Sequence, residues 1–579
     1  MKISWVSPLC RLIGVVCAGL LLTAFLVWID PWVDRTATWT EVALNAAPTW
    51  AVFLVLVGAL GRPSPALLAS FAWISALFYL NSLKLDELGQ PLLFTDLWLL
   101  GQVLKHLGFL SGYVNVPWVS SVLVLGVIGF WVLIKSEPRW LRGPARAASM
   151  MLGAVALWGV LGDKGEALYR DSILPNNAWS PAATIESRGW MASAVAAIHT
   201  DWVALPEANR GTISMLKKAW MANQTPDMAA RTNTIQRPDV VVILSESFFE
   251  PRYLKNAKTC VLLPRWCELI GEGAAGEMTV PTFGGNTTRT EYELLTGVPY
   301  AALPQGIYPY TSVVLQPTAS IVWWAKHLGY ETTAVHPHDR YFWQRHRAFP
   351  LLGFDEFLAE DAFGGHRREG FWISDDDLTD KVMDVLDRDS DAPQWVFAIS
   401  MENHGPWHAS RPNIDQDTLA SLPTIDGLEG TAEHAYRTYL YHQRNAVSAL
   451  DRLWQHVQTR DRPTVVLFFG DHLPGLHETF EQAGFTEGWT PMTHPVPYLA
   501  LAHPNPIEID WQPSSSHQLG IWLMDGAGLP LPTDYGLVRD QWRGVDSNAP
   551  SSLDAIYPHL INLSPKPWLA ERCERFELC

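Results

Sequence analysis

Long apolar stretches dominate the first quarter of the chain, and much shorter ones follow. Five mostly apolar runs cover residues 9–29, 46–61, 65–83, 117–134 and 147–162. Each is near the ~20 residues that an α-helix needs to cross the hydrocarbon core of a bilayer, although the second and fifth are short. One such run could be a buried core helix, but five in succession favour five membrane-spanning helices. We therefore expect a transmembrane domain over residues 1–162.

Charged residues indicate how these helices cross the membrane. Acidic residues fall mainly in one set of alternate loops, and the other set holds the basic residues Lys2, Arg11, Arg62, Lys135, Arg139, Arg142 and Arg146. The positive-inside rule then places the N-terminus in the cytoplasm, and five crossings place everything after residue 162 outside the cytoplasmic membrane. The first run is too long for a signal peptide and lacks a small-residue cleavage site, so we expect it to be retained.

The pattern changes after the last apolar run. Residues 163–234, which prolines interrupt, are expected to form a juxtamembrane helical linker. From residue 235 helical segments such as 433–458 alternate with short β-branched runs at 239–245, 332–335, 395–400, 464–470 and 497–501. This alternation predicts an α/β domain over 235–540, with a mostly parallel sheet and helices on both faces. Residues 541–579 show no readable pattern and are expected to be a C-terminal extension.

Charge and cysteine content restrict the environment and the partners. The formal net charge of −17 over 579 residues argues against nucleic acid as a partner. Four of the six cysteines, Cys260, Cys267, Cys573 and Cys579, follow the apolar runs, and disulfides can form outside the cytoplasm. The local pairs 260–267 and 573–579 are the simplest of three pairings, between which the sequence does not choose. A zinc site is the alternative, but the spacing is not C-x-x-C.

Polar residues with metal-binding and nucleophilic chemistry follow the strand-like runs. Glu246 follows 240–244, and the pair Asp471-His472 follows 464–470. Thr287 lies in a glycine-rich turn before a helix-like segment, 290–296. In an open α/β sheet functional groups gather at the carboxyl ends of the strands. Two carboxylates, an imidazole and a hydroxyl could there bind Mn²⁺, Mg²⁺ or Zn²⁺ and convert the hydroxyl into a nucleophile.

Thr287 has an ordinary structural alternative. A threonine beside a glycine turn is a common helix N-cap, and Thr288 and Thr290 could serve as nucleophile in its place. A hydroxyl at a helix N-terminus also faces free N–H groups and the positive end of the helix dipole, which suits an anionic phosphate.

Two further segments could bind a phosphorylated substrate. After the run at 332–335, Arg345 could grip a phosphate through two hydrogen bonds, His336 could donate a hydrogen bond or a proton, and Trp343 could pack against a small alcohol headgroup. His404 follows the run at 395–400 and could bind phosphate or protonate a leaving alkoxide. The alternatives are a basic surface loop and a hydrogen-bonded loop histidine.

In this order, the segments resemble the lipoteichoic acid synthase and phosphoglycerol transferase family, sulfatase-like enzymes of the alkaline phosphatase superfamily. Val240 to Phe248 resembles the family's first strand with its metal-binding glutamate, and Gly284 to Tyr292 resembles its nucleophile loop. The family's substrate-site spacing and its last metal ligands are matched by His336, Trp343, Arg345, His404 and Gly470-Asp471-His472. Five membrane spans before an extracytoplasmic domain also fit.

The resemblance implies both a site and a reaction. Glu246, Thr287, Asp471 and His472 would bind one divalent cation, most often Mn²⁺, and His336, Trp343, Arg345 and His404 would hold the phosphoglycerol group. Thr287 would attack phosphatidylglycerol, an anionic glycerophospholipid, release diacylglycerol, and pass phosphoglycerol to a glycan or polyglycerol-phosphate acceptor at the cell envelope. Asn286 departs from the Gly or Lys expected there, which leaves the acceptor open.

Other functions are compatible with parts of this pattern. The first is phosphoethanolamine transfer to lipid A or another surface glycan, although that branch usually has a different nucleophile region and more cysteines. The second is a metal-dependent phosphodiesterase. A sulfatase would need a C/S-x-P-x-R motif, which the sequence lacks. A non-enzymatic membrane scaffold would be indicated by a missing ligand, but all four proposed ligands are present.

Overall fold

The computed structural model describes residues 8–30, 38–88, 92, 96, 115–169, 188–200, 205–223, 237–304, 307–486, 488–491, 493–544 and 553–565. Contacts divide the chain into two compact units, Met1–Val203 and Ala204–Cys579. We describe each unit by itself.

The first unit is helical. Five of its described helices are long and apolar enough to cross a membrane, as expected: α1 (Pro8–Ile29), α2 (Trp39–Leu60), α3 (Pro63–Leu88), α6 (Val116–Ser136) and α7 (Pro144–Leu161). Helices α2 and α7 begin before the apolar runs at 46–61 and 147–162. The capping box at Thr38 and Glu41 starts α2, and a proline starts α7. The described residues of this unit also form two shorter helices, α8 (Asp163–Tyr169) and α10 (Trp190–Thr200).

A small apolar core joins the helices of the first unit. Leu22, Phe53, Val57 and Ile74 from α1, α2 and α3 are fully or almost fully buried. Asn45 of α2 is buried as well, and its side chain accepts a hydrogen bond from Ala192 N in α10 at 2.8 Å. No described side chain of α6 is buried, so this helix presents apolar residues all round, as a helix facing lipid does.

The second unit contains a seven-stranded sheet in the order β2-β9-β8-β1-β7-β3-β4. Its strands are β1 (Asp239–Ser245), β2 (Ala274–Met278), β3 (Glu331–Val335), β4 (Glu356–Leu358), β7 (Gln394–Ile399), β8 (Thr464–Gly470) and β9 (Val496–His503). The central strands β8, β1, β7, β3 and β4 run parallel, which confirms the predicted mostly parallel sheet. At one edge β9 pairs antiparallel with β8 and β2 pairs antiparallel with β9. The strands β5 (Arg368–Glu369) and β6 (Trp372–Ile373) form a separate hairpin.

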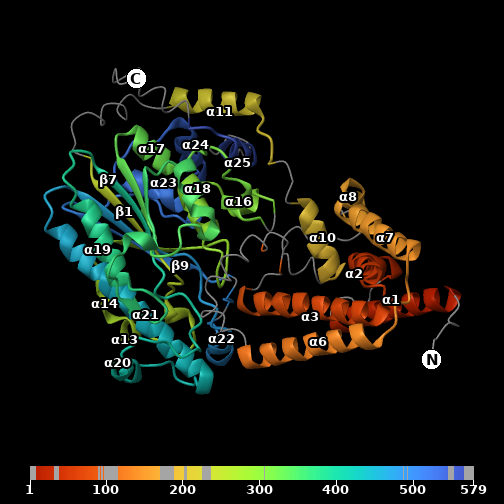
Figure 1. Cartoon of the computed structure of the whole chain (residues 1–579). Coiled ribbons are helices and arrows are strands. Elements are labelled where there is room, and N and C mark those ends of the chain that lie inside the picture. Colours follow the sequence, from red (N-terminus) through yellow and green to blue (C-terminus); the bar gives the residue numbers. More distant parts are fainter. Residues whose placement is uncertain are drawn as a thin grey trace. The chain divides into compact units, whose positions relative to one another are not determined.

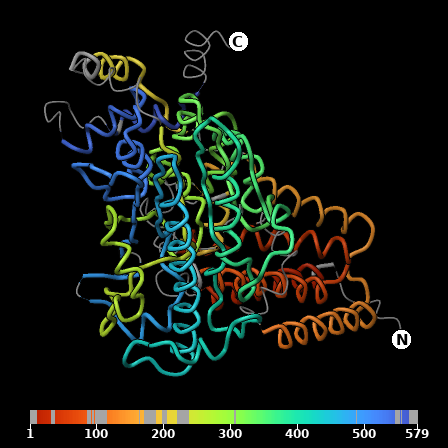
Figure 2. Tube along the Cα trace, turned by 90° about the vertical axis from the view of Figure 1, so that its left-hand side faces the viewer, coloured from red at the N-terminus to blue at the C-terminus, as the bar shows by residue number. Residues whose placement is uncertain are grey.

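Helices cover both faces of this sheet, as Figure 1 and Figure 2 show. One face carries α14 (Pro264–Leu269), α19 (Asp375–Leu386) and the long α21 (Gly430–Gln458). The other carries α17 (Ile321–His327), α18 (Arg345–Leu351) and α23 (Ser516–Gly526), with α15 (Thr288–Thr296) packed against α17 and α23. Shorter or peripheral helices are α11 (Arg210–Asn223), α13 (Thr259–Leu262), α16 (Pro309–Ser312), α20 (Gln416–Ser421), α22 (His477–Ala483), α24 (Thr533–Trp542) and α25 (Leu553–Ile561).

Two features modify the picture expected from the sequence. The expected extension at 541–579 contributes a helix, α25, whose Ile556, Leu560 and Ile561 are buried in the core of the second unit. This helix was not foreseen because Pro558 interrupts its apolar pattern. A disulfide joins Cys260 and Cys267, with an S–S distance of 2.07 Å, whereas Cys573 and Cys579 lie outside the described residues.

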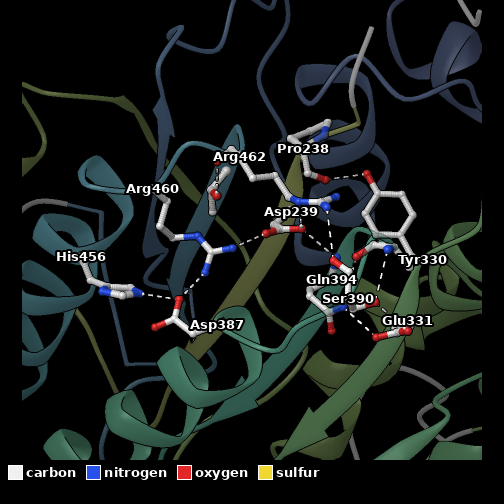
Figure 3. A network of polar contacts seen from close by, with 12 residues as sticks. Pro238, Asp239, Tyr330, Glu331, Asp387, Ser390, Gln394, His456, Arg460 and Arg462 are labelled. Atoms are coloured by element: carbon white, nitrogen blue, oxygen red, sulfur yellow. Dashed lines mark hydrogen bonds and ion pairs between the residues drawn. The ribbon is translucent and has the colours of Figure 1, made fainter.

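At the amino ends of the central strands, a polar network holds neighbouring strands in register (Figure 3). Asp239, which is fully buried at the start of β1, accepts hydrogen bonds from Gln394 N of β7 at 2.8 Å and from Arg460 at 2.6 Å. Arg460 also contacts Asp387 at 2.8 Å. Burial raises the pKa of Asp239, and the arginine opposes that shift. The network therefore fixes strand alignment at the end of the sheet opposite to Glu246 and Asp471.

Replacing Asp239 with alanine should destabilise the protein. The change leaves Arg460 partly unpaired and Gln394 N without its acceptor, so we expect the midpoint of thermal unfolding to fall by roughly 5 °C. The measurement is thermal unfolding of the full chain in detergent. Asp384→Ala is the matched control, because Asp384 forms only an exposed ion pair with Lys381. Equal midpoints for the two variants would contradict a structural role for the network.

Candidate functional site

Strand pairing brings the proposed metal ligands together. In the register of β1 and β8, Ser245 pairs with Gly470, the last residue of β8. Glu246 and Asp471 are the first residues after the two strands. No side chain could be accommodated at Gly470, because a Cβ there would lie 1.9 Å from the carbonyl oxygen of Phe248. The parallel pairing therefore delivers two carboxylates to one point at the carboxyl edge of the sheet.

The buried side chains of Glu246, Asp471 and His472 form a compact cluster. One ligand atom from each lies within 4.8 Å of the other two, and Nε2 of His472 lies 3.4 Å from Glu246 Oε1 and 3.2 Å from Asp471 Oδ2. The Nδ1 of His472 lies 2.9 Å from the carbonyl oxygen of Leu473, which can only accept a hydrogen bond. Nδ1 therefore carries the proton in the neutral ring, and the lone pair of Nε2 points toward the carboxylates.

This arrangement fits a divalent cation. Burial, reinforced by Asp471, raises the pKa of Glu246 to about 8, so the folded chain disfavours two adjacent carboxylates without positive charge. No described residue hydrogen-bonds to Asp471 Oδ2 or to His472 Nε2. Two carboxylate oxygens and one imidazole nitrogen converge within 4.8 Å of one another, and such a set suits Mn²⁺, Mg²⁺ or Zn²⁺.

Neighbouring groups hold these ligands in place. Ser247 has a positive φ of 55°, and in this conformation its N–H donates to Asp471 Oδ1 at 2.8 Å and its hydroxyl to Glu246 Oε1 at 2.9 Å. Tyr439 of α21 donates to the carbonyl oxygen of Ser247 at 2.8 Å, and Ser400 accepts from Glu246 N at 2.9 Å. The strained residue is thus fixed by the ligands that it orients.

The loop that carries Thr287 is fastened to the same strand end. Thr290 Oγ1 donates to the carbonyl oxygen of Asp471 at 2.9 Å, and Gly284 N donates to that of Leu473 at 3.0 Å. Thr287 is the N-cap residue of α15, which begins at Thr288 rather than at the expected 290, but its side chain makes no capping hydrogen bond. Since Thr290 is occupied and Thr288 is fully buried, Thr287 remains the strongest nucleophile candidate of the three.

Arg345 and His336 also meet, in an arrangement that the sequence did not indicate. Arg345 is buried and binds Glu291 of α15 through Nη2 at 2.5 Å and Nε at 3.3 Å. Its Nη1 donates to Nε2 of His336 at 3.2 Å, and Nδ1 of His336 donates to the carbonyl oxygen of Ile399 at 3.2 Å. Burial and Arg345 lower the pKa of His336 well below its usual range. His336 is therefore neutral here, and it orients Arg345 instead of offering a proton.

Trp343 and His404 are the remaining expected substrate residues. Trp343 is buried in the left-handed region, with a φ of 55°, and Gln344 follows with a φ of 59°. Such strain at two consecutive residues with side chains requires firm support and is common in ligand-binding segments. His404 is half-buried, and its Nδ1 donates to the carbonyl oxygen of Gly405 at 3.1 Å. Burial lowers the pKa of His404, and the hydrogen bond to Gly405 opposes that shift.

Arg289 is a residue of the site that the sequence did not single out. Its side chain is buried between Tyr300, 4.5 Å from the guanidinium, and Tyr308, at 5.9 Å. Its Nε has no hydrogen-bond partner among the described residues. Cation–π contact contributes roughly 0.5–2 kcal/mol, whereas burying an unpaired ion costs several kcal/mol. From the sequence, Arg289 and Glu293 would be expected to form an i, i+4 pair, but Glu293 instead binds Tyr300 N and Ser516.

Known proteins resemble this chain in sequence and in fold. The sequence profile of the Sulfatase family matches residues 238–529. A protein of Rhizobium meliloti (strain 1021) named "Putative cyclic beta-1,2-glucan modification protein" is 28% identical over 567 residues, which cover 92% of this chain and 85% of that protein. The capsular polysaccharide biosynthesis protein RkpI of the same organism is 27% identical over 469 residues, 77% of this chain and 78% of its own.

Two solved structures align with this chain. The integral membrane protein lipooligosaccharide phosphoethanolamine transferase A (EptA) from Neisseria meningitidis aligns with a TM-score of 0.51 and 15% identity, over 90% of this chain and 95% of its own. The phosphoglycerol transferase GacH of Streptococcus pyogenes, in complex with sn-glycerol-1-phosphate, aligns with a TM-score of 0.49 and 18% identity, over 65% of this chain and 100% of its own. The EptA alignment extends over both units.

Metal binding should stabilise the folded protein. Mn²⁺ in ~100-fold excess over its dissociation constant adds about 2.7 kcal/mol of stability, which we expect to raise the unfolding midpoint by several degrees. Asp471→Asn should remove most of this increase, because the amide keeps an acceptor for Ser247 N but loses the charge. Asp380→Asn, which changes an exposed carboxylate, is the control. An unchanged wild-type midpoint with Mn²⁺, Mg²⁺ and Zn²⁺ would contradict the site.

Glu293 should make stability depend on pH. Complete burial raises its pKa from 4.5 to about 7, so the folded state holds a proton that the unfolded state releases. Stability therefore falls as the pH rises from 4.5 to 7, and the penalty then persists. Glu293→Gln lacks this penalty, so its unfolding midpoint relative to wild type should be higher at pH ~8 than at pH ~5. The same difference at both pH values would show that Glu293 does not hold the proton.

Proposed function

This chain belongs to the Sulfatase family, and we propose that it is a membrane-bound phosphoglycerol transferase acting through a covalent Thr287 intermediate. The convergence of Glu246, Asp471 and His472, with the Thr287 loop fastened to the same strand end, carries the proposal. The donor would be phosphatidylglycerol and the acceptor a glycan or a polyglycerol-phosphate chain. The resemblance to phosphoglycerol transferases, motif by motif, supports glycerol as the transferred headgroup.

In the first step Thr287 forms a bond to the phosphorus of the lipid headgroup. The bond from phosphorus to the diacylglycerol oxygen breaks, the threonine proton passes to water, and the departing oxygen takes up a proton. A divalent cation bound by Glu246, Asp471 and His472, with Thr287, would lower the pKa of the hydroxyl and draw charge from a phosphoryl oxygen. In the second step an acceptor hydroxyl attacks phosphorus and loses its proton to water, while the bond from phosphorus to the threonine oxygen breaks and that oxygen takes up a proton, which restores the nucleophile.

The protein side chains would hold and neutralise the phosphoglycerol group. Arg345 keeps a fixed orientation through Glu291 and His336, and its remaining N–H groups can bind the phosphate without reorganisation. His404, whose Nδ1 donates to the carbonyl oxygen of Gly405, would help to hold the phosphoglycerol group. Trp343 supplies an apolar wall against the glycerol carbons.

The curated relatives support a glycan acceptor. The protein named for cyclic β-1,2-glucan modification matches 92% of this chain, and the RkpI protein is named for capsular polysaccharide synthesis. Five apolar helices of membrane-spanning length and the charge of their loops support a catalytic unit outside the cytoplasmic membrane. We therefore infer a cell-envelope glycan, modified outside the cytoplasm, as the acceptor.

The decisive experiment measures diacylglycerol release from labelled lipid. The full chain in detergent, with Mn²⁺, should release diacylglycerol from phosphatidylglycerol, and Thr287→Ala should lower the rate by at least ~10³-fold, since it removes the covalent step. Thr288→Ala, which lacks the neighbouring hydroxyl, is the matched control and should keep most of the activity. If Thr287→Ala retains near-normal turnover, the nucleophile is another group.

Phosphatidylethanolamine and water-only reactions separate the alternatives. Release from phosphatidylethanolamine alone would identify an ethanolamine transferase. Release without transfer to any added glycan or polyglycerol phosphate, and with free glycerol phosphate as the product, would identify a phosphodiesterase. Transfer of label from phosphatidylglycerol to a cyclic glucan would support the proposed reaction as a whole.

A further inference from the structure

Arg289 is a buried cation for which the described part of the chain provides no counter-charge. It lies two residues after Thr287 and is 3% exposed, its Nε has no hydrogen-bond partner among the described residues, and no described carboxylate forms an ion pair with it. Buried arginines are rare unless paired. An acceptor for this guanidinium is therefore expected from a molecule that binds beside the nucleophile.

The two nearest acidic residues in sequence are already engaged elsewhere. Glu291 holds Arg345 and also accepts from Tyr310 at 3.0 Å. Glu293 accepts from Tyr300 N at 2.6 Å and from the hydroxyl of Ser516. Both carboxylates are thus engaged by other groups, and neither forms an ion pair with Arg289.

Aromatic rings connect Arg289 to the expected headgroup wall. Its guanidinium lies over Tyr300 and near Tyr308, and the ring of Tyr308 contacts that of Trp343 at a centroid distance of 4.8 Å. Tyr300 is immobilised by its hydroxyl, which donates to the carbonyl oxygen of Ile307 at 2.9 Å. Arg289 is thus held on a rigid aromatic support that continues into Trp343, two residues before Arg345.

We propose that Arg289 is a specificity-determining residue that reads the headgroup of the donor lipid. This inference rests on the proposed function and explains how the protein would select a glycerol headgroup over an ethanolamine headgroup. A guanidinium has five N–H donors and no acceptor. The hydroxyl oxygens of glycerol can accept from it, whereas the ammonium of ethanolamine has only donors and is repelled by its charge. Hydrogen bonding and electrostatics therefore discriminate in the same direction.

The test is the selectivity of the full chain, in detergent with Mn²⁺, between phosphatidylglycerol and phosphatidylethanolamine. Wild type should favour phosphatidylglycerol in kcat/KM. Arg289→Gln should lower that preference at least about tenfold, because it removes both the donors and the charge. Arg289→Lys should lose rate with phosphatidylglycerol but keep rejecting phosphatidylethanolamine, since the charge remains. A purely structural role would lower both rates and leave their ratio unchanged.

Arg539→Gln is the matched control, because Arg539 of α24 is also buried but is paired with Asp525 of α23 and Asp540 of α24. Its selectivity should equal that of wild type. A wild-type ratio in Arg289→Gln, or a wild-type preference for phosphatidylethanolamine, would overturn the inference.

A binding measurement separates this inference from the proposed reaction. Thermal shifts of the full chain with Mn²⁺ would be recorded for sn-glycerol 1-phosphate and for phosphoethanolamine. Wild type should be stabilised more by the glycerol compound, and Arg289→Gln by both compounds alike. If wild type turns over neither lipid but shows this binding pattern, the proposed reaction is wrong and the role of Arg289 in headgroup selection is supported. If the two compounds shift the unfolding midpoint of Arg289→Gln as differently as that of wild type, Arg289 does not select the headgroup.

Discussion

Parallel pairing of β1 with β8 is the constraint on which the rest of the site depends. It places Glu246 and Asp471 side by side after the paired residues Ser245 and Gly470, in surroundings that exclude water. Burial raises the pKa of Glu246 to about 8, and repulsion by the neighbouring carboxylate of Asp471 adds to that shift. A bound cation would lower the electrostatic cost of this arrangement, and the Thr287 loop is hydrogen-bonded to the same strand end.

The two ends of the same sheet treat charge in opposite ways. At the amino ends, Asp239 and Asp387 share Arg460 (Figure 3), so the charges there are balanced by the chain itself. At the carboxyl ends, acceptor atoms of Asp471 and His472 lack partners among the described residues. Buried charge is thus balanced by the chain at the amino ends, whereas at the carboxyl ends acceptor atoms remain that a ligand could bind.

Most of the architecture could be predicted from the sequence, because period and length are local properties. The apolar runs gave the five long helices, and β-branched runs gave β1, β3, β7, β8 and β9. The sequence pattern is too weak to predict short or weakly apolar strands such as β2. It is also too weak to predict α25, which contains a proline. The cluster of Glu246, Asp471 and His472 was predictable because its members follow strand ends. The pairing of Arg345 with Glu291 and the isolation of Arg289 were not, since they arise from packing between distant segments.

Gly470 shows how narrowly such a site can vary. Every other amino acid has a Cβ, and at this position that atom would collide with the carbonyl oxygen of Phe248. The backbones of the β8 exit and of the segment after Glu246 would then have to separate, and the two carboxylates with them. Any mutation of this glycine codon that changes the residue meets the same obstacle. Steric exclusion alone therefore keeps this position a glycine, although glycine has no side chain that could take part in the chemistry.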